Sequence, residues 1–247
     1  DDSVIGGIAG AIAPRESDHI VEIGPGQGAL TEALVSSGCQ LEVIELDRDL
    51  IAGLLAAFSI HKGFKLHSAD ALKFDFSSLV DGDKKLRIVG NLPYNISTPL
   101  IFHILQWHDL VIDMHFMLQK EVVDRMAAAP GSKTYGRLSV MTQFRCQVTP
   151  LFDVLPTSFS PVPRVSSSIV RLEPLKTPPA DTGSFKNLQR VVIAAFSKRR
   201  KTLRNSLREL LTADEILAAG IDPGQRAEQL SLSQFAALAR SLPYDAD

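Results

Sequence analysis

The stretch Val21-Glu22-Ile23-Gly24-Pro25-Gly26-Gln27-Gly28 decides the fold, because a short apolar run ends there in three closely spaced glycines. Residues 19–23 predict a β-strand, and residues 29–37 have the pattern of a helix. Glycine adopts positive φ readily and lets the backbone approach a ligand closely. The stretch therefore predicts a strand–turn–helix unit with a ligand-binding turn.

The same alternation of strand and helix continues along the chain. Asp1-Asp2-Ser3 before an apolar pattern predicts an opening helix that ends near Pro14. After the glycine turn we expect strands at 41–46, 64–67, 86–89 and 114–118, and helices at 50–58, 99–106 and 122–126. Such alternation is typical of βαβ units and a parallel sheet. A helix at 138–144 precedes strands at 147–154 and 167–172, which predict a seven-stranded sheet with one antiparallel strand.

A linker rich in proline and glycine follows at residues 173–183. Beyond it every periodic segment is helical, at 188–196, 202–211, 213–219 and 233–242. We therefore expect two domains, an α/β domain at residues 1–176 and a small all-α domain at residues 184–247.

Composition narrows the class of protein. The chain has 247 residues, of which 45% are hydrophobic and 22% charged, as in an ordinary folded protein, and its net charge of −2 predicts no polyanion partner by itself. Cys39 and Cys146 lie far apart without neighbouring ligands, so we expect reduced thiols and no structural metal site. No apolar run reaches the roughly 18 residues of a membrane span, so we expect no membrane association and a cytoplasmic location.

The glycine spacing and the residue before it indicate which kind of ligand the turn binds. The spacing is Gly-x-Gly-x-Gly, whereas dinucleotide-binding folds carry Gly-x-Gly-x-x-Gly. Glu22 would repel a pyrophosphate but would suit a ligand with an ammonium group and no phosphate, such as S-adenosylmethionine. A glycine-rich turn with an incidental glutamate remains the alternative.

Polar residues end the next three predicted strands as well. Glu45 ends the second strand, where nucleotide-binding α/β folds place an acid for the ribose hydroxyls, and Asp70 ends the third, where it could accept from an adenine amine. Asn91-Leu92-Pro93-Tyr94 ends the fourth, so an amide, a free carbonyl and an aromatic ring suit a planar ring that carries an amine. Each acid alone is more often a helix cap, and Asn-Leu-Pro-Tyr alone a turn. Together they would line one crevice.

These stretches resemble the ribosomal RNA adenine dimethyltransferases, above all the bacterial small-subunit members. Further similar segments are Met117 to Val122, Tyr135 to Val140, Phe159 to Ser167 and Arg199 to Asn205, so the resemblance covers essentially the whole chain. The family carries Phe-Gly-Gln-Asn-Phe-Leu just before the point where this chain begins, and that segment helps to cover the cofactor.

The resemblance implies a class I S-adenosylmethionine-dependent methyltransferase, with a Rossmann-like seven-stranded sheet and a small all-α C-terminal domain. It implies transfer of methyl groups to N6 of two adjacent adenosines near the 3′ end of 16S rRNA, during biogenesis of the 30S subunit. The expected cofactor-binding residues are Glu22, Gly24, Gly26, Gly28, Glu45, Leu46, Asp70, Ala71 and Asn91. The expected catalytic residues are Asn91, Leu92, Pro93, Tyr94 and Phe159.

The expected partner is 16S rRNA within a pre-30S subunit, bound by a monomer. Between Asp181 and Glu209 the chain has basic residues and no acid, which suggests phosphate contact, although such a run is usually a solvated helix face. The expected RNA-binding residues are Lys198, Arg199, Arg200, Lys201 and Arg204.

Two rival functions remain open on the same fold. One is the sister family that dimethylates an adenine of large-subunit rRNA and gives macrolide resistance, although Asn95-Ile96-Ser97-Thr98-Pro99-Leu100 and the basic segment favour the small-subunit enzyme. The other is a non-catalytic assembly or transcription factor, against which the intact Asn91-Leu92-Pro93-Tyr94 argues.

Overall fold

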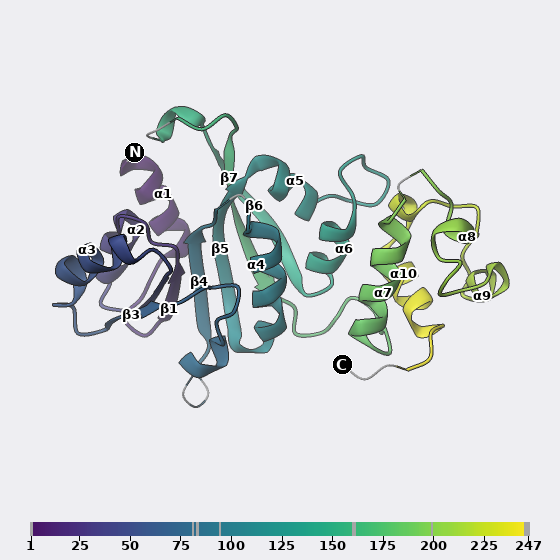
Figure 1. The fold of residues 1–247 in the computed structure, drawn as a ribbon, viewed down its shortest axis with the longest axis horizontal. Helices are drawn as coiled ribbons and strands as arrows, with labels where there is room; N and C mark the ends of the chain where they lie inside the picture. The colour runs from purple at the N-terminus through teal and green to yellow at the C-terminus, as the bar shows by residue number, and fades with distance from the viewer. Residues whose placement is uncertain are drawn as a thin grey trace. The chain divides into compact units, whose positions relative to one another are not determined.

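The computed structural model describes residues 2–80, 82, 84–93, 95–159, 162–198 and 200–244. The chain forms two compact units (Figure 1). The first contains Asp1–Val123 and Val148–Pro174, and the second contains Asp124–Gln147 and Leu175–Asp247.

A seven-stranded sheet carries the first unit, in the order β3-β2-β1-β4-β5-β7-β6. Strands β1 to β5 are parallel, and β7 runs antiparallel to β5, as the sequence predicted. The strands are β1 His19–Ile23, β2 Gln40–Glu45, β3 Phe64–Ser68, β4 Leu86–Asn91, β5 Val111–Gln119, β6 Cys146–Val154 and β7 Ser167–Pro174. The order reverses between β1 and β4, and a crevice opens at the carboxyl ends of parallel strands at such a point.

Helices cover both faces of this sheet. Because crossovers between parallel strands are right-handed, the connections that lead from β1 toward β3 and from β4 toward β5 place their helices on opposite faces. On one face Ile12, Leu34 and Leu54 pack with Ile20 and other strand residues in one core. The helical elements that precede β7 in the chain, apart from α6, are α1 Asp2–Ile12, α2 Ala29–Val35, α3 Arg48–Phe58, η1 Phe76–Leu79, α4 Ser97–Ile104, η2 Leu105–Leu110, α5 Lys120–Met126 and η3 Pro156–Ser158.

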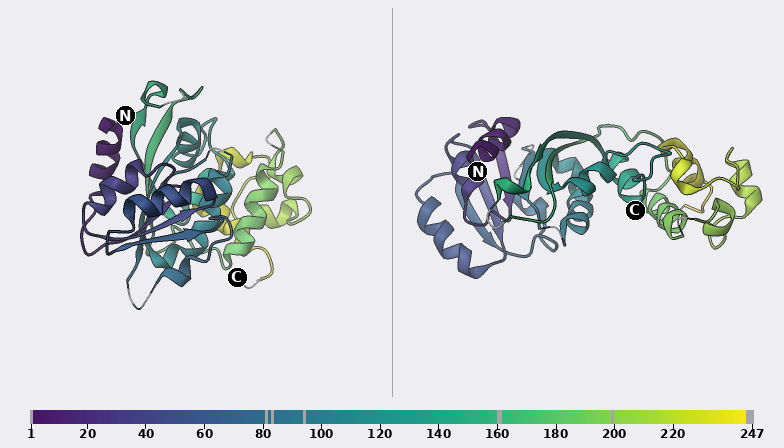
Figure 2. Two further views of the ribbon diagram at one scale, coloured as in Figure 1. Left: turned by 60° about the vertical axis from the view of Figure 1, so that its left-hand side comes forward. Right: turned by 90° about the horizontal axis from the view of Figure 1, so that it is seen from above.

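The second unit is helical (Figure 2). Its elements are α6 Arg137–Gln143, α7 Phe185–Phe196, α8 Leu203–Ser206, α9 Ala213–Ala218, η4 Ala227–Gln229 and α10 Leu232–Arg240. The prediction of one helix over 202–211 was wrong, because only α8 is helical there. The chain turns after it, and a capping box between Thr212 and Glu215 begins α9.

The compact units do not coincide with the predicted domains at residues 1–176 and 184–247. Residues 124–147 belong to the second unit although they precede the last two strands in the chain. Gln143 donates hydrogen bonds to the carbonyls of Met126 and Ala128, and Leu175 donates to the carbonyl of Arg145. A linker in the sequence cannot reveal a unit that is built from two separate segments of the chain, as the second unit is.

The largely buried guanidinium of Arg87 ties the first unit together. Arg87 in β4 forms two 2.9 Å hydrogen bonds with Asp113 in β5 and one of 2.7 Å with Asp18. It also donates to the carbonyl of Ile12 at 2.7 Å, where α1 ends. The Arg87 side chain is 11% exposed and that of Asp113 3% exposed, so each charge depends on its partner.

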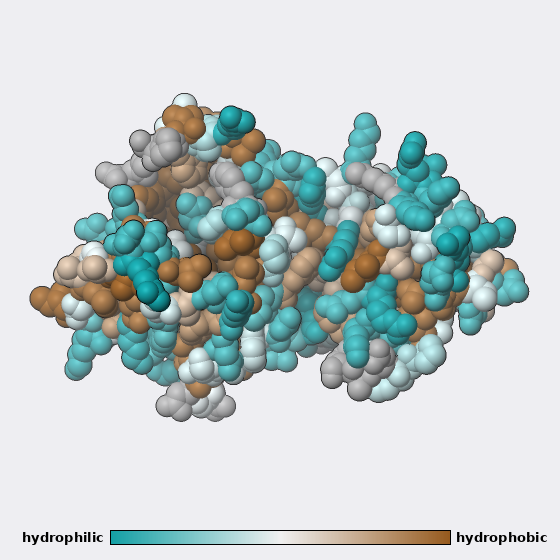
Figure 3. Space-filling view, viewed as in Figure 1, coloured by the Kyte–Doolittle hydropathy of each residue, from teal (hydrophilic) through white to brown (hydrophobic). Residues whose placement is uncertain are grey.

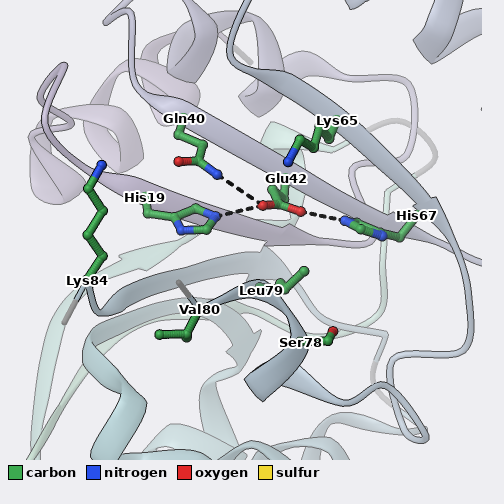
Figure 4. A pocket seen from close by; sticks show the side chains of 9 residues that line it. All are labelled: His19, Gln40, Glu42, Lys65, His67, Ser78, Leu79, Val80 and Lys84. Carbon is green, nitrogen blue, oxygen red and sulfur yellow. Dashed lines mark hydrogen bonds and ion pairs between the residues drawn. The ribbon is translucent and has the colours of Figure 1, made fainter. Parts of the chain in front are cut away.

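A second polar cluster lies over β1, β2 and β3 (Figure 4). The Glu42 carboxylate accepts from His19 at 2.9 Å, from His67 at 2.6 Å and from Gln40 at 3.2 Å. Burial alone would raise the pKa of Glu42, but the hydrogen bonds from the two histidines outweigh it and lower that pKa to about 2. The histidines lie on opposite sides of the carboxylate, so these three groups stabilise one another.

Within the described ranges, no helix is long and apolar enough to span a bilayer.

We predict that Arg87→Met lowers the free energy of unfolding by about 3–5 kcal/mol, because the buried Asp113 loses both hydrogen bonds from Arg87 and is left with the looser 3.7 Å ion pair to Arg171. Urea denaturation followed by circular dichroism measures this difference. Lys85→Met is the matched control, since Lys85 is an exposed neighbour, and it is expected to change stability by under about 0.5 kcal/mol. Equal effects of the two substitutions would contradict the stabilising role of Arg87.

Candidate active site

The glycine turn has the left-handed backbone that the sequence suggested. Gly24, Gly26 and Gly28 have φ values of 65°, 60° and 87°. A Cβ atom on Gly28 would lie 2.5 Å from the ring of Phe58, whereas a Cβ on Gly26 would meet nothing within 4 Å. Gly28 is therefore required for packing, while Gly26 leaves open space above the turn.

Glu22 is a buried carboxyl at the base of this turn. It is 2% exposed, and the hydroxyl of Thr31 donates a 2.7 Å hydrogen bond to its Oε2. Burial raises the pKa of Glu22 to about 7, against the lowering effect of the Thr31 hydrogen bond and with a small contribution from Glu45. The group is poised to ionise when a cation binds beside it.

A cavity of about 500 Å³ opens above Glu22. Predicted site residues among those that line it are Glu22, Gly24, Gly26, Asn91 and Phe159. Apolar walls come from Val4, Ile5 and Ile8 of α1, and Figure 3 shows a hollow with hydrophobic side chains near the N-terminal end of this helix. A cavity of this size with few polar groups suits a small organic ligand.

Two further acids lie at the same edge of the sheet. Glu45 is 8% exposed, and its Oε1 accepts from the backbone N–H groups of Leu46 and Asp47 at 2.8 and 2.9 Å. The N–H of Ala69 donates to the carbonyl of Glu45, which joins the ends of β2 and β3 beside Asp70.

The carboxylate of Asp70 accepts from the N–H of Leu72 at 3.0 Å, and Ala71 between them is half-buried. Leu46 is 65% exposed, and an exposed apolar side chain here offers a surface for a flat ring.

The Asn-Leu-Pro segment leaves the sheet at the end of β4. Asn91 is exposed and lines the cavity, whereas Leu92 is buried and donates a backbone hydrogen bond to Met117 at 3.2 Å. Pro93 is exposed, and its carbonyl accepts from the N–H groups of Ile96 and Ser97. Tyr94 lies outside the described residues.

Phe159, which the resemblance predicts to be catalytic, lies between the core and the cavity. The side chain is half-buried and packs against the core of the first unit. The same residue lines the cavity, together with Ser158.

The basic segment lies in the second unit, where α7 ends and α8 begins. Lys198, Arg200, Lys201 and Arg204 are exposed, and Arg199 lies outside the described residues. The start of α8 is fixed by backbone hydrogen bonds from Leu203 to Gln225 and from Arg204 to Pro223. Exposed cations on a fixed backbone could contact phosphate groups.

The sequence reasoning did not identify Thr31 or His115 as site residues. Thr31 is fully buried in the helix after the glycines, and its hydroxyl faces Glu22. His115 lines the cavity from β5. Only the alternation of β5, which places His115 on the same face as Met117, could have indicated this location. No group of three or more His, Cys, Asp or Glu in the described part of the chain is arranged to hold a metal ion.

The sheet order and the crevice at its reversal define a class I methyltransferase fold. Residues 1–243 match the family described as Ribosomal RNA adenine dimethylase, and the chain belongs to this family. It is 56% identical over 242 residues to Ribosomal RNA small subunit methyltransferase A of Pseudomonas aeruginosa, covering 98% of this chain and 90% of that protein. The protein of the same name from Methylococcus capsulatus is 53% identical, with 98% and 93% covered.

Solved structures agree with this assignment. A dimethyladenosine transferase from Plasmodium falciparum superposes with a TM-score of 0.79 at 25% identity, covering 96% of this chain and 94% of that one. The 23S rRNA methyltransferase ErmE superposes with a TM-score of 0.74 at 23% identity, covering 98% of both chains, and so shares the fold.

We predict that Gly28→Ala destabilises the protein more than Gly26→Ala does. Both substitutions force a side chain into positive φ, but only the first also drives a Cβ into Phe58. Gly26→Ala is expected to cost about 1 kcal/mol and Gly28→Ala about 2 kcal/mol more. Thermal unfolding measures both variants, and equal losses would show that the Phe58 contact contributes nothing.

Proposed function

We propose that this protein transfers methyl groups from S-adenosylmethionine to N6 of two adjacent adenosines in the 3′-terminal hairpin of 16S rRNA. The observation that carries this proposal is the cavity at the reversal of the sheet order, which both Glu22 and Asn91 line. Membership of an rRNA adenine dimethylase family supports adenine methylation as the reaction. Relatives at 53–56% identity are named small subunit methyltransferases, which supports small-subunit rRNA as the substrate.

The residues at the carboxyl ends of the strands fit the methyl donor. Glu22 would pair with its ammonium group, Glu45 with its ribose hydroxyls and Asp70 with its adenine amine. Gly24 and Gly26 would admit it close to the backbone, Leu46 and Ala71 would contact its base, and Gly28 would hold the turn against α3. When bound, S-adenosylmethionine supplies a methyl group on a positively charged sulfur.

Asn91 and Leu92 would prepare the target amine. The lone pair of an adenine N6 is delocalised into the purine ring and is a poor nucleophile. We infer that the side-chain oxygen of Asn91 and the backbone carbonyl of Leu92 would accept hydrogen bonds from the two N6–H groups, which would turn the lone pair toward the methyl group. The new N–C bond would form as the S–C bond breaks, S-adenosylhomocysteine would leave, and the acidic methylated ammonium would lose its proton to water. Positioning and electrostatics then carry the reaction. Pro93 fixes the turn, and Tyr94 and Phe159 are the rings on which the flipped base would stack, at roughly 1–3 kcal/mol per base.

The RNA would be held by the second unit as well. Lys198, Arg200, Lys201 and Arg204, together with Arg199, would neutralise phosphates. We propose that the substrate is the rRNA of a pre-30S subunit, that the protein acts as a monomer in the cytoplasm, and that residues 1–176 and 184–247 act as catalytic and rRNA-binding domains.

We predict that Asn91→Ala lowers turnover on undermodified small subunits about a hundredfold or more, because it removes an acceptor aimed at the reacting amine. Labelled S-adenosylmethionine measures the methyl transfer. The free energy of unfolding is expected to change by under about 0.5 kcal/mol, since the Asn91 side chain is exposed, and cofactor affinity is measured separately so that weaker binding is told apart from slower methyl transfer. Near-normal turnover would refute the mechanism.

Asn91→Asp tests the second methylation separately. An anionic acceptor would tolerate the monomethyl amine less well than an amide does. We predict an increased ratio of monomethyl to dimethyl product, measured by mass spectrometry of the digested RNA. An unchanged ratio would show that the charge at this position does not control the second step.

We predict that the affinity for S-adenosylmethionine rises about tenfold between pH 5.5 and pH 7. The pKa of Glu22 in the free protein is raised to about 7, and a bound ammonium favours the ionised form, so binding below pH 7 releases a proton. Isothermal titration calorimetry measures the affinity. Glu22→Gln is expected to abolish the dependence, while Glu32→Gln, a change at an exposed acid, is expected to leave it intact.

We predict that reversing the charge of Lys198, Arg200 and Lys201 to glutamate weakens RNA binding and flattens its dependence on salt. Each lost phosphate contact lowers the slope of log K against log salt by roughly one. Filter binding at salt concentrations between about 50 and 200 mM, where phosphate contacts change the RNA affinity strongly, measures this slope. Reversal of the exposed Lys62 and Lys85 in the first unit is the control, and an unchanged slope in the first variant would contradict the contact.

A further inference from the structure

Thr31 in α2 carries a buried hydroxyl that is directed at Glu22 in β1. The residue is 0% exposed, and its Oγ1 donates a 2.7 Å hydrogen bond to Oε2 of Glu22. Thr31 lies three residues after Gly28, so the glycine turn returns the start of α2 to the end of β1. Because the hydroxyl is closed to bulk water, no solvent molecule takes its place when it is removed.

The two oxygens of the Glu22 carboxyl have different surroundings. Oε2 is occupied by Thr31, whereas Oε1 accepts no hydrogen bond within the described residues. Oε1 is also not sealed from solvent, unlike the buried polar atoms in that part of the chain that have no partner. Glu22 lines the 500 Å³ cavity, so Oε1 is the oxygen that a ligand in the cavity can reach.

The hydrogen bond from Thr31 favours the ionised form of Glu22. Burial raises the pKa of Glu22 to about 7, and the hydroxyl of Thr31 acts in the opposite direction. A donor stabilises a carboxylate more than it stabilises the neutral acid, because the bond to a charged oxygen is stronger. Without the hydroxyl, burial would act unopposed and Glu22 would stay protonated to a higher pH.

Charged groups on the elements that pack against Glu22 do not replace Thr31. Glu45, on the same face at the end of β2, raises the pKa of Glu22 further. Arg87 on β4 is already held by two carboxylates, and burial lowers the pKa of His115 on β5 to about 4, so that ring is neutral at pH 7. Glu32 of α2 is exposed, and the α1 residues that line the cavity are apolar. Thr31 is therefore the group among these that favours the carboxylate.

We propose that Thr31 is a positioning residue for the methyl donor, because its hydroxyl holds one oxygen of Glu22 and presents the other as a carboxylate to the ammonium group. This inference rests on the proposed function and adds a residue that does not line the cavity itself. Thr31 acts on the donor through Glu22 alone. A serine would serve in its place, whereas an apolar residue of the same shape would not.

The test compares Thr31→Val, which keeps the shape of the side chain, with the wild-type protein at two pH values. Isothermal titration calorimetry measures the affinity for S-adenosylmethionine. We expect the variant to bind about tenfold more weakly at pH 6 and about twofold more weakly at pH 8, because losing a hydrogen bond to a charged group raises the midpoint of Glu22 by about one pH unit. Affinity rises as Glu22 ionises, so the variant recovers at higher pH. Because both proteins are compared at each pH, titration of the ligand itself cancels.

Further variants assign the effect to the Thr31 hydroxyl and to Glu22. Thr31→Ser keeps the hydroxyl and is expected to restore the wild-type dependence on pH. Thr142→Val is the matched control, since Thr142 is also fully buried and its hydroxyl has no hydrogen-bond partner in the described chain, and it is expected to leave the dependence unchanged. In a Glu22→Gln background, Thr31→Val is expected to change the affinity by the same factor at both pH values.

A measurement without ligand separates this inference from the proposed function. Heteronuclear NMR of the Glu22 carboxyl carbon in the free protein is expected to show a midpoint about one pH unit higher in Thr31→Val. An unchanged midpoint, or a loss of affinity that is equal at both pH values, would overturn the inference. If Thr31→Val does not fold, Thr31→Ala removes the same hydroxyl and takes its place. Failure of the wild-type protein to bind S-adenosylmethionine would refute the proposed function, whereas binding with a Glu22 midpoint that does not depend on the Thr31 hydroxyl would refute only this inference.

Discussion

The pairing of β1 with β4 is the constraint on which the site depends. These strands lie side by side although the chain forms β2 and β3 between them. Their approach is close, since a Cβ on Gly90 would lie 2.5 Å from the carbonyl oxygen of Ile23. The pairing brings Glu22 and Asn91 to one cavity and sends the two sets of crossover helices to opposite faces.

Buried charge is used in three different ways around this sheet. Arg87 and Asp113 neutralise each other and hold the end of α1. The Glu42 carboxylate is occupied by His19, His67 and Gln40, which leaves it as a structural group. Glu22 is bonded to one hydroxyl and lines the cavity, so it retains hydrogen-bonding capacity for a ligand.

Local patterns predicted the elements of the first unit well and those of the second less well. The strands of the sheet carry short apolar runs that end in turn residues, and Gly24, Gly26 and Gly28 have the positive φ that their spacing suggested. In residues 202–211 leucines recur at helical spacing, yet the helix stops after one turn. Its start is fixed by hydrogen bonds to distant loops, and those long-range contacts have no local signal.

The sequence by itself determined the class of fold, the family and the residues at the strand ends, because each is encoded in a contiguous motif. Only the tertiary structure decided which buried polar groups are satisfied. Residues 22, 89 and 115 are far apart in the chain, and strand register alone sets them in one row. It also decided that residues 124–147 pack with the C-terminal helices. Burial raises the pKa of Glu22 and lowers that of His115, and burial depends on the whole fold, which no single segment specifies.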